Sequence, residues 1–195
     1  MGAVIAAAVA MDWADDEIER RIRLAFVDSS PLDDIDFPMI AMTHGNKVNE
    51  RLHDHFGDFE IADLWLPYFC VSSNLTAGAY HLHQTGNLSK ALRASIAIPG
   101  ILPPVIFNGQ VLVDGAVMKN LPADVMRSMH RGPIVAVDVS RARGLSEHDV
   151  ERPESIWRWL WSGRWRQGPP IVALLMRAAT VTTSRDLINS RENSD

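Results

Sequence analysis

The sequence predicts an α/β fold with a largely parallel sheet. Segments with helical periodicity alternate along the chain with short apolar segments of strand character, an alternation typical of α/β domains. One of these segments, IVAVDVS at residues 134–140, is apolar apart from Asp138 and Ser140, as strands covered on both faces often are. The 195 residues are 47% hydrophobic and 22% charged, which is enough to bury a core and excludes a wholly disordered chain.

Composition and charge exclude several classes of function. The formal net charge of -5 offers no electrostatic basis for general nucleic-acid binding. Cys70 is the only cysteine, which excludes an internal disulfide framework and a zinc site built from cysteines. Because Cys70 lies in an apolar strand segment, we expect a small core residue rather than a nucleophile.

The first part of the chain is predicted to be helical. Residues 1–11 (MGAVIAAAVAM) lack the basic residues that begin a signal peptide and are too few to span a bilayer, so we expect a buried helix. Residues 15–26 repeat apolar side chains every four positions, which indicates an amphipathic helix. Residues 47–56 form a third predicted helix, which Gly57 ends.

Strands and helices alternate in the part that follows. Residues 67–75 and 78–83 are strand candidates, and Asn87 is a good cap for the helix that comes after them. Residues 111–113 form a short predicted strand, and residues 121–130 a further helix. These elements complete the alternation on which the fold prediction depends.

The strongest local feature is Asp114-Gly115 at the end of a predicted strand. Side chains at this end of a strand project into the crevice where open α/β sheets bind ligands. Gly115 permits a backbone turn that a Cβ would hinder. An ordinary Asp-Gly turn fits the same spacing, and the spacing alone does not separate the two interpretations.

Three separated motifs carry a resemblance to a known family. They are IADLWLPYFCVSSNLTAG at residues 61–78, LSKALRASIAIPGILPP at residues 88–104 and VLVDGAVMKNLPADVM at residues 111–126. In this order and spacing they resemble the patatin-like phospholipases, in particular the branch of neuropathy target esterase and its bacterial relatives. The resemblance implies a three-layer α/β/α sandwich, incomplete at the N-terminus. Residues 1–140 would form the C-terminal portion of that domain, and residues 141–195 a charged loop, a Trp-rich segment and a helix or tail.

The resemblance also implies a catalytic pair, a serine on a Gly-x-Ser-x-Gly elbow and an aspartate in an Asp-Gly-Gly or Asp-Gly-Ala motif. Asp114, Gly115 and Ala116 match the second motif, so Asp114 is the expected general base. A serine hydroxyl is a weak nucleophile and needs such a base to take its proton. A carboxyl group with its ordinary pKa near 3.9 is a weak base unless its surroundings raise that pKa.

The elbow motif is absent from the 195 residues. Aligning the elbow with the start of the chain makes Gly2 its closing glycine and places the nucleophile immediately before Met1. The glycine-rich oxyanion loop of the family lies further upstream. We therefore expect an N-terminally truncated lipid acyl hydrolase that retains the base and is inactive alone. The alternative is a non-catalytic remnant that binds a membrane or a protein.

The resemblance implies a phospholipid or lysophospholipid substrate, no cofactor or metal, and a cytoplasmic location. A peripheral membrane contact is suggested by interleaved tryptophan and arginine, which suit a membrane interface. Packing of the same tryptophans on the domain surface is an equally weighted alternative. The tryptophans concerned are Trp157, Trp159, Trp161 and Trp165.

Two histidines, His81 and His83, share one face of a predicted strand because residues two apart do so. Such a pair could chelate a metal ion together. No cysteine or clear carboxylate nearby completes a metal site, so solvated polar positions are the favoured interpretation.

Overall fold

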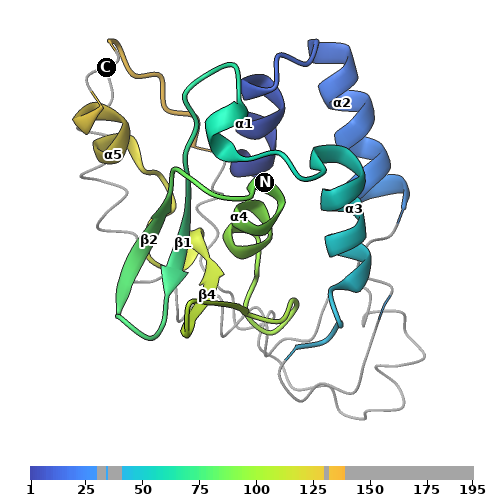
Figure 1. Cartoon of the computed structure of the whole chain (residues 1–195), viewed down its shortest axis with the longest axis vertical. Helices are drawn as coiled ribbons and strands as arrows, with labels where there is room; N and C mark the ends of the chain where they lie inside the picture. The colour runs from blue at the N-terminus through green and yellow to red at the C-terminus, as the bar shows by residue number, and fades with distance from the viewer. Residues whose placement is uncertain (30–33, 35–40, 130–131, 139–195) are drawn as a thin grey trace, which may run out of the picture. The chain divides into compact units, whose positions relative to one another are not determined.

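The computed structural model describes residues 1–29, 34, 41–129 and 132–138 (Figure 1). The chain divides into two compact units, Met1–Asn120 and Leu121–Asp195, which are described separately. The predicted strand end at residues 139–140, the Trp-rich segment and the C-terminal helix or tail lie outside the described residues. The proposed domain of residues 1–140 stays a prediction.

Four α-helices of the first unit lie where the sequence predicts them. They are α1 (Gly2–Ala10), α2 (Asp15–Arg23), α3 (Asn46–Phe56) and α4 (Leu88–Ser95). Short helical turns η1 (Leu24–Asp28) and η2 (Ile61–Asp63) extend α2 and precede the sheet. Within α1, Val4, Ala7 and Ala10 are buried, while Ile5 and Val9 are each 45% exposed. The first helix is therefore buried on one side rather than all round.

The sheet has four strands in the order β2-β1-β4-β3. The strands are β1 (Cys70–Asn74), β2 (Ala79–His83), β3 (Val105–Phe107) and β4 (Gln110–Asp114). Together with the helices, this sheet confirms the α/β class.

The largely parallel sheet that the sequence predicts is not found among these strands, since each of their three pairings is antiparallel. Short connections explain two of the three antiparallel pairs, because a parallel pair needs a crossover of a dozen or more residues. Only residues 75–78 join β1 to β2, and only Asn108-Gly109 joins β3 to β4. Both turn residues have positive φ, 49° and 74°, as the preferred hairpin turn requires.

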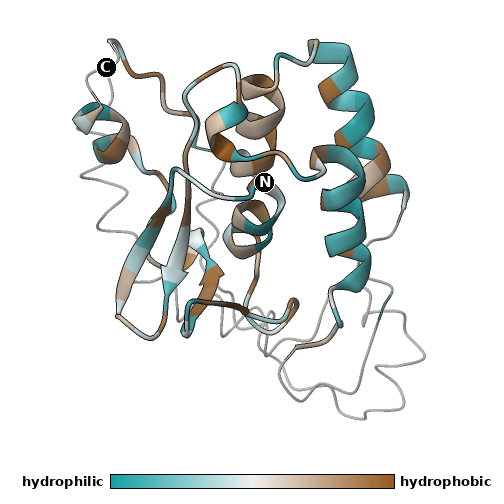
Figure 2. Cartoon of the chain, viewed as in Figure 1, coloured by the Kyte–Doolittle hydropathy of each residue, from teal (hydrophilic) through white to brown (hydrophobic). Residues whose placement is uncertain are grey.

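The core lies where α1, α3, α4 and the start of β1 meet. Leu52 of α3 and Leu88 and Leu92 of α4 are at most 1% exposed. The Tyr68 hydroxyl, just before β1, donates a hydrogen bond to the Ala3 carbonyl oxygen at 3.1 Å and so ties α1 to the sheet. Figure 2 shows the opposite character along α2 and α3, where hydrophilic residues predominate.

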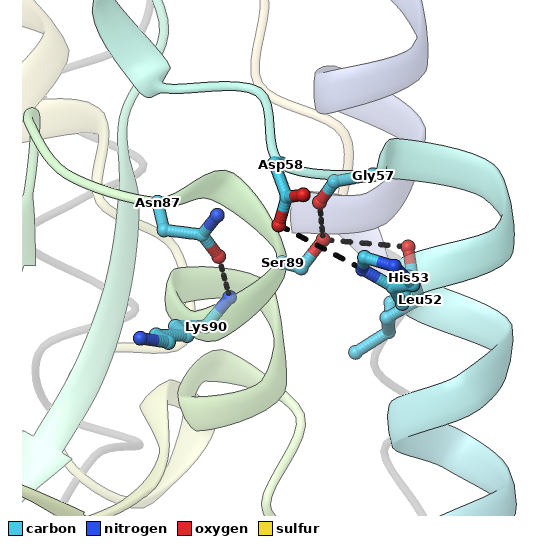
Figure 3. A network of polar contacts seen from close by, with 7 residues as sticks. All are labelled: Leu52, His53, Gly57, Asp58, Asn87, Ser89 and Lys90. Carbon is cyan, nitrogen blue, oxygen red and sulfur yellow. Dashed lines mark hydrogen bonds and ion pairs between the residues drawn. The ribbon is translucent and has the colours of Figure 1, made fainter.

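The end of α3 is joined to the start of α4 by polar contacts (Figure 3). The Ser89 hydroxyl donates to the Gly57 carbonyl oxygen at 2.8 Å and lies 3.4 Å from that of Leu52. Asn87 accepts a hydrogen bond from the Lys90 N–H at 3.0 Å, which confirms it as the cap of α4. Ser89 thus satisfies the Gly57 carbonyl group, which lies just after α3 and has no partner within the helix.

In the second unit, α5 (Ala123–Ser128) lies within the predicted helix of residues 121–130. Residues 134–138, in the predicted strand, belong to no strand, and Val135 and Val137 are 88% and 74% exposed. Among the described residues of both units, no helix is long and apolar enough to cross a membrane.

Candidate active site

Asp114 is the last residue of β4, and its side chain organises the turn that follows. The carboxylate oxygen Oδ1 accepts a hydrogen bond at 2.8 Å from the Ala116 N–H, in the turn η3 (Gly115–Val117). The backbone N–H of Asp114 donates to the Ala97 carbonyl oxygen at 2.9 Å. The carboxyl group is thereby held at a strand end by contacts with its own motif and with the segment after α4.

Gly115 is needed because the turn passes directly over the backbone of β1. A Cβ at this position would lie 2.3 Å from the Val71 carbonyl oxygen, a distance that real Cβ atoms do not reach. Gly115 is not among the glycines with positive φ. Close approach to a neighbouring strand, rather than the conformation of the turn, therefore explains the glycine of this motif.

Ser73 of β1 fixes the same turn from the neighbouring strand. Its hydroxyl donates to the Asp114 carbonyl oxygen at 2.9 Å and accepts from the Met118 N–H at 3.0 Å. Ser73 is completely buried. Sequence analysis did not select this residue, since a serine in an apolar strand carries no local sign of the turn that it will meet.

The surroundings of Asp114 make it a stronger base than an ordinary carboxylate. Burial raises the pKa of Asp114, while the hydrogen bond from Ala116 and the charge of the Met1 amino group act in the opposite direction. Gly2, the first residue of α1, is exposed, and a Cβ there would meet nothing within 4 Å.

A second polar pair lies beside this site and was missed by sequence analysis. Ser72 Oγ and His83 Nε2 share a hydrogen bond of 2.8 Å, and the two residues are 0% and 7% exposed. Burial, and then His81, lowers the pKa of His83 to about 4, so its ring is neutral at pH 7. The interpretation of both histidines as solvated positions is therefore wrong for His83.

The two histidines are part of a ring cluster that spans the sheet. Their ring centroids are 4.5 Å apart, and that of His81 lies 5.8 Å from the ring of Phe107. Phe107 belongs to β3 and the histidines to β2, which are the two outer strands, so the rings meet across the two inner strands. Across the part of the chain that the structure describes, no three His, Cys, Asp or Glu residues are grouped to hold a metal ion.

Cys70 is a core residue, as predicted. Its side chain is buried, and burial raises the pKa of the thiol to about 11. The thiolate, which is the reactive form, is therefore scarce at neutral pH.

Comparison with known proteins places the chain in a family. Residues 1–127 match the model of the family described as patatin-like phospholipase. Neuropathy target esterase sws of Drosophila melanogaster is 33% identical over 170 residues, 83% of this chain and 12% of its own length. An uncharacterized NTE family protein of Mycobacterium tuberculosis is 34% identical over 188 residues, 94% of this chain and 32% of its own length.

A human relative gives the same result. Patatin-like phospholipase domain-containing protein 6 is 38% identical over 133 residues, 67% of this chain and 10% of its own length. The chain therefore spans between a tenth and a third of the length of these relatives. The match over residues 1–127, which contains the Asp114 turn, and these relatives show that the chain belongs to the patatin-like phospholipase family, in its neuropathy target esterase branch.

Proposed function

We propose that Asp114 is the general base of a serine–aspartate site that hydrolyses acyl esters of phospholipids or lysophospholipids. The observation that carries this proposal is the carboxyl group itself, partly buried at the end of β4 and bonded to the Ala116 N–H, with a pKa raised by burial. A raised pKa lets a carboxylate take a proton more readily from a serine hydroxyl. Family membership and the names of the relatives support an acyl ester of a lipid as the substrate.

In the proposed reaction, Asp114 takes the hydroxyl proton of the serine while the serine oxygen attacks the ester carbonyl. Collapse of the tetrahedral intermediate breaks the ester bond, and the proton passes from Asp114 to the departing alcohol. A water molecule, deprotonated by Asp114, then attacks the acyl-enzyme, and the proton passes from Asp114 to the serine oxygen as the fatty acid leaves. Each half of the reaction needs the carboxylate in its ionised form.

The serine of this pair is not found among the 195 residues in a Gly-x-Ser-x-Gly context. We place it directly before Met1, where alignment of the elbow with the start of the chain puts it, with Gly2 as the closing glycine. The 195 residues alone would then contribute the base and no nucleophile.

The test compares the 195-residue chain with a chain extended upstream by a Gly-x-Ser elbow. Fatty acid release from phosphatidylcholine and lysophosphatidylcholine is measured, together with labelling by a fluorophosphonate probe. The 195-residue chain should show neither, and the extended chain both. In the extended chain, Asp114→Asn should lower kcat by a factor of about 10² to 10⁴. Serine-dependent turnover by the 195-residue chain, or full activity of the Asn variant, contradicts the proposal.

We also propose that this protein is cytoplasmic and that it meets its substrate through a peripheral membrane contact. The proposal rests on sequence alone, because the tryptophans lie outside the described residues. Flotation with vesicles of phosphatidylcholine and phosphatidylserine tests it, with Trp159 and Trp161 replaced by serine. Loss of flotation supports the contact, and unchanged flotation contradicts it.

A further inference from the structure

Ser72 occupies the position between Asp114 and the histidine pair. In the ladder of β1 with β4, Ser72 is directly opposite Asp114, and in the ladder of β1 with β2 it is opposite His81. Side chains directly opposite one another lie on the same face of a sheet. The register therefore places His81, Ser72 and Asp114 in one row across three strands.

The hydroxyl of Ser72 is also hydrogen-bonded to His83, at 2.8 Å. A serine hydroxyl has one hydrogen to donate and two lone pairs that accept. If the His83 ring nitrogen Nε2 carries its hydrogen, it donates to Ser72 and leaves the hydroxyl hydrogen free to turn toward Asp114. If Nε2 carries no hydrogen, Ser72 donates its hydroxyl hydrogen to Nε2 and turns a lone pair toward the carboxyl group. The hydrogen position on His83 thus decides what Ser72 presents to Asp114.

Burial strengthens the effect that the hydrogen position on His83 has on its neighbours. Ser72 is completely buried and His83 nearly so, and the pKa of Asp114 is itself raised by burial. Hydrogen bonds and dipoles act more strongly where water is excluded. Complete burial also rules out Ser72 as the nucleophile, although its distance to His83 resembles that of a serine and its base.

We propose that Ser72 and His83 are positioning residues for Asp114, a buried hydroxyl–imidazole pair that orients one dipole beside the carboxyl group and sets how readily it holds a proton. This inference rests on the proposed function only for the role given to Asp114. The coupling between the three side chains is a property of the sheet and exists with or without a nucleophile.

Other titratable groups surround the row. The Met1 amino group of α1 acts on Asp114, and His81 acts on His83. Burial raises the pKa of the Cys70 thiol and keeps it protonated. Of the cations on neighbouring segments, Arg93 of α4 bonds to Asn49 and Pro103, and Lys119 lies over the Tyr80 ring. A test must therefore change Ser72 or His83 while these groups stay as they are.

The experiment follows the Asp114 carboxyl carbon by ¹³C NMR as the pH is changed, with the 195-residue chain. Ser72→Ala and His83→Gln should each move the titration midpoint by half a pH unit or more, about a threefold change in proton affinity. An upward shift means that Ser72 donates to the carboxylate, and a downward shift means that it presents a lone pair. Two substitutions away from the row, Ser89→Ala and His53→Gln, should leave the midpoint unchanged.

A midpoint that stays in place in both folded variants overturns the inference. If Ser72→Ala does not fold, a reciprocal measurement decides. In Asp114→Asn, which keeps the shape of the side chain, the ¹⁵N shifts of the His83 ring should change, and unchanged shifts overturn the inference equally. Failure of the proposed function is separate, because it would appear as activity independent of Asp114 in the extended chain while the NMR coupling persists.

Discussion

Ser72 and Ser73 are neighbours on β1, both completely buried, yet they serve the site in different ways. Ser73 bonds to the backbone of the Asp114 turn, whereas Ser72 bonds to a side chain, that of His83. Successive side chains of a strand point to opposite faces. Ser73 can therefore bond to the neighbouring turn on one face of the sheet, while Ser72 lies in the row with His81 and Asp114 on the other. The comparison separates groups that hold the shape of the turn from groups that tune its carboxylate.

The largest effect is expected from a substitution that disrupts the close contact between the Asp114 turn and β1. Gly115→Ala forces a Cβ to within 2.3 Å of the Val71 carbonyl oxygen, and backbone must move to relieve it. We expect a loss of unfolding free energy of about 3 kcal/mol, at the upper end for overpacking. Chemical denaturation measures it. Gly2→Ala is the matched control, since its Cβ meets nothing, and it should be neutral or slightly stabilising. Equal effects of the two substitutions would contradict the close-approach explanation.

Acid should destabilise the folded chain through His83, the hydrogen-bond partner of Ser72. The pKa of His83 is about 4 in the folded chain and 6.5 ordinarily, so the unfolded chain binds the proton more readily. The full stability is present above pH 6.5 and falls as the pH drops toward 4, by up to about 3 kcal/mol, since one pKa unit corresponds to about 1.4 kcal/mol. Denaturation midpoints between pH 7.5 and 4 measure the loss. In His83→Gln the slope over this range should be smaller, and an unchanged slope would show that other groups cause it.

Removing the Ser73 hydroxyl should loosen the turn while leaving His83 as it is. Ser73→Ala removes the hydrogen bonds to the Asp114 carbonyl oxygen and from the Met118 N–H, which keeps only its 3.2 Å bond to the Gly115 carbonyl oxygen. We expect a loss of about 1–3 kcal/mol, since each hydrogen bond contributes about 0.5–1.5 kcal/mol. Hydrogen exchange at the Met118 amide should accelerate at least tenfold in this variant. Ser72→Ala is the matched control, because it removes a hydroxyl from the same strand without touching that amide. Faster exchange in both variants would mean that the two serines do not act separately.

Ser89→Ala should give the smallest effect and sets the scale for a serine remote from the site. Its hydroxyl bonds to the Gly57 carbonyl oxygen at the junction of α3 and α4, where the serine is only partly buried. We expect a loss of about 1 kcal/mol, the usual net worth of one hydrogen bond. Thermal unfolding measures it. A loss of unfolding free energy as large as that of Ser73→Ala would contradict the expectation that Ser73, at the Asp114 turn, contributes more to stability than a serine remote from the site.

Much of the local structure follows from the sequence because its causes are local. Helical periodicity and caps lie within a few residues of one another, and α1 to α4 occur where these patterns predict helices. Asn108-Gly109 is a hairpin signal of the same local kind, so the antiparallel pair β3 and β4 was within reach of sequence reasoning. The pairing of β1 with β4 could not be predicted from the sequence, because no local pattern indicates which distant strand will be the neighbour.

The sequence by itself determined the class of the fold, the family resemblance and the candidate residue Asp114. The tertiary structure alone decided why Gly115 is a glycine, which serine meets the turn and which meets His83. The physical reason is register: a shift of one residue turns every side chain of a strand to the other face. The register of β1 between β2 and β4 depends on the packing of all the strands at once.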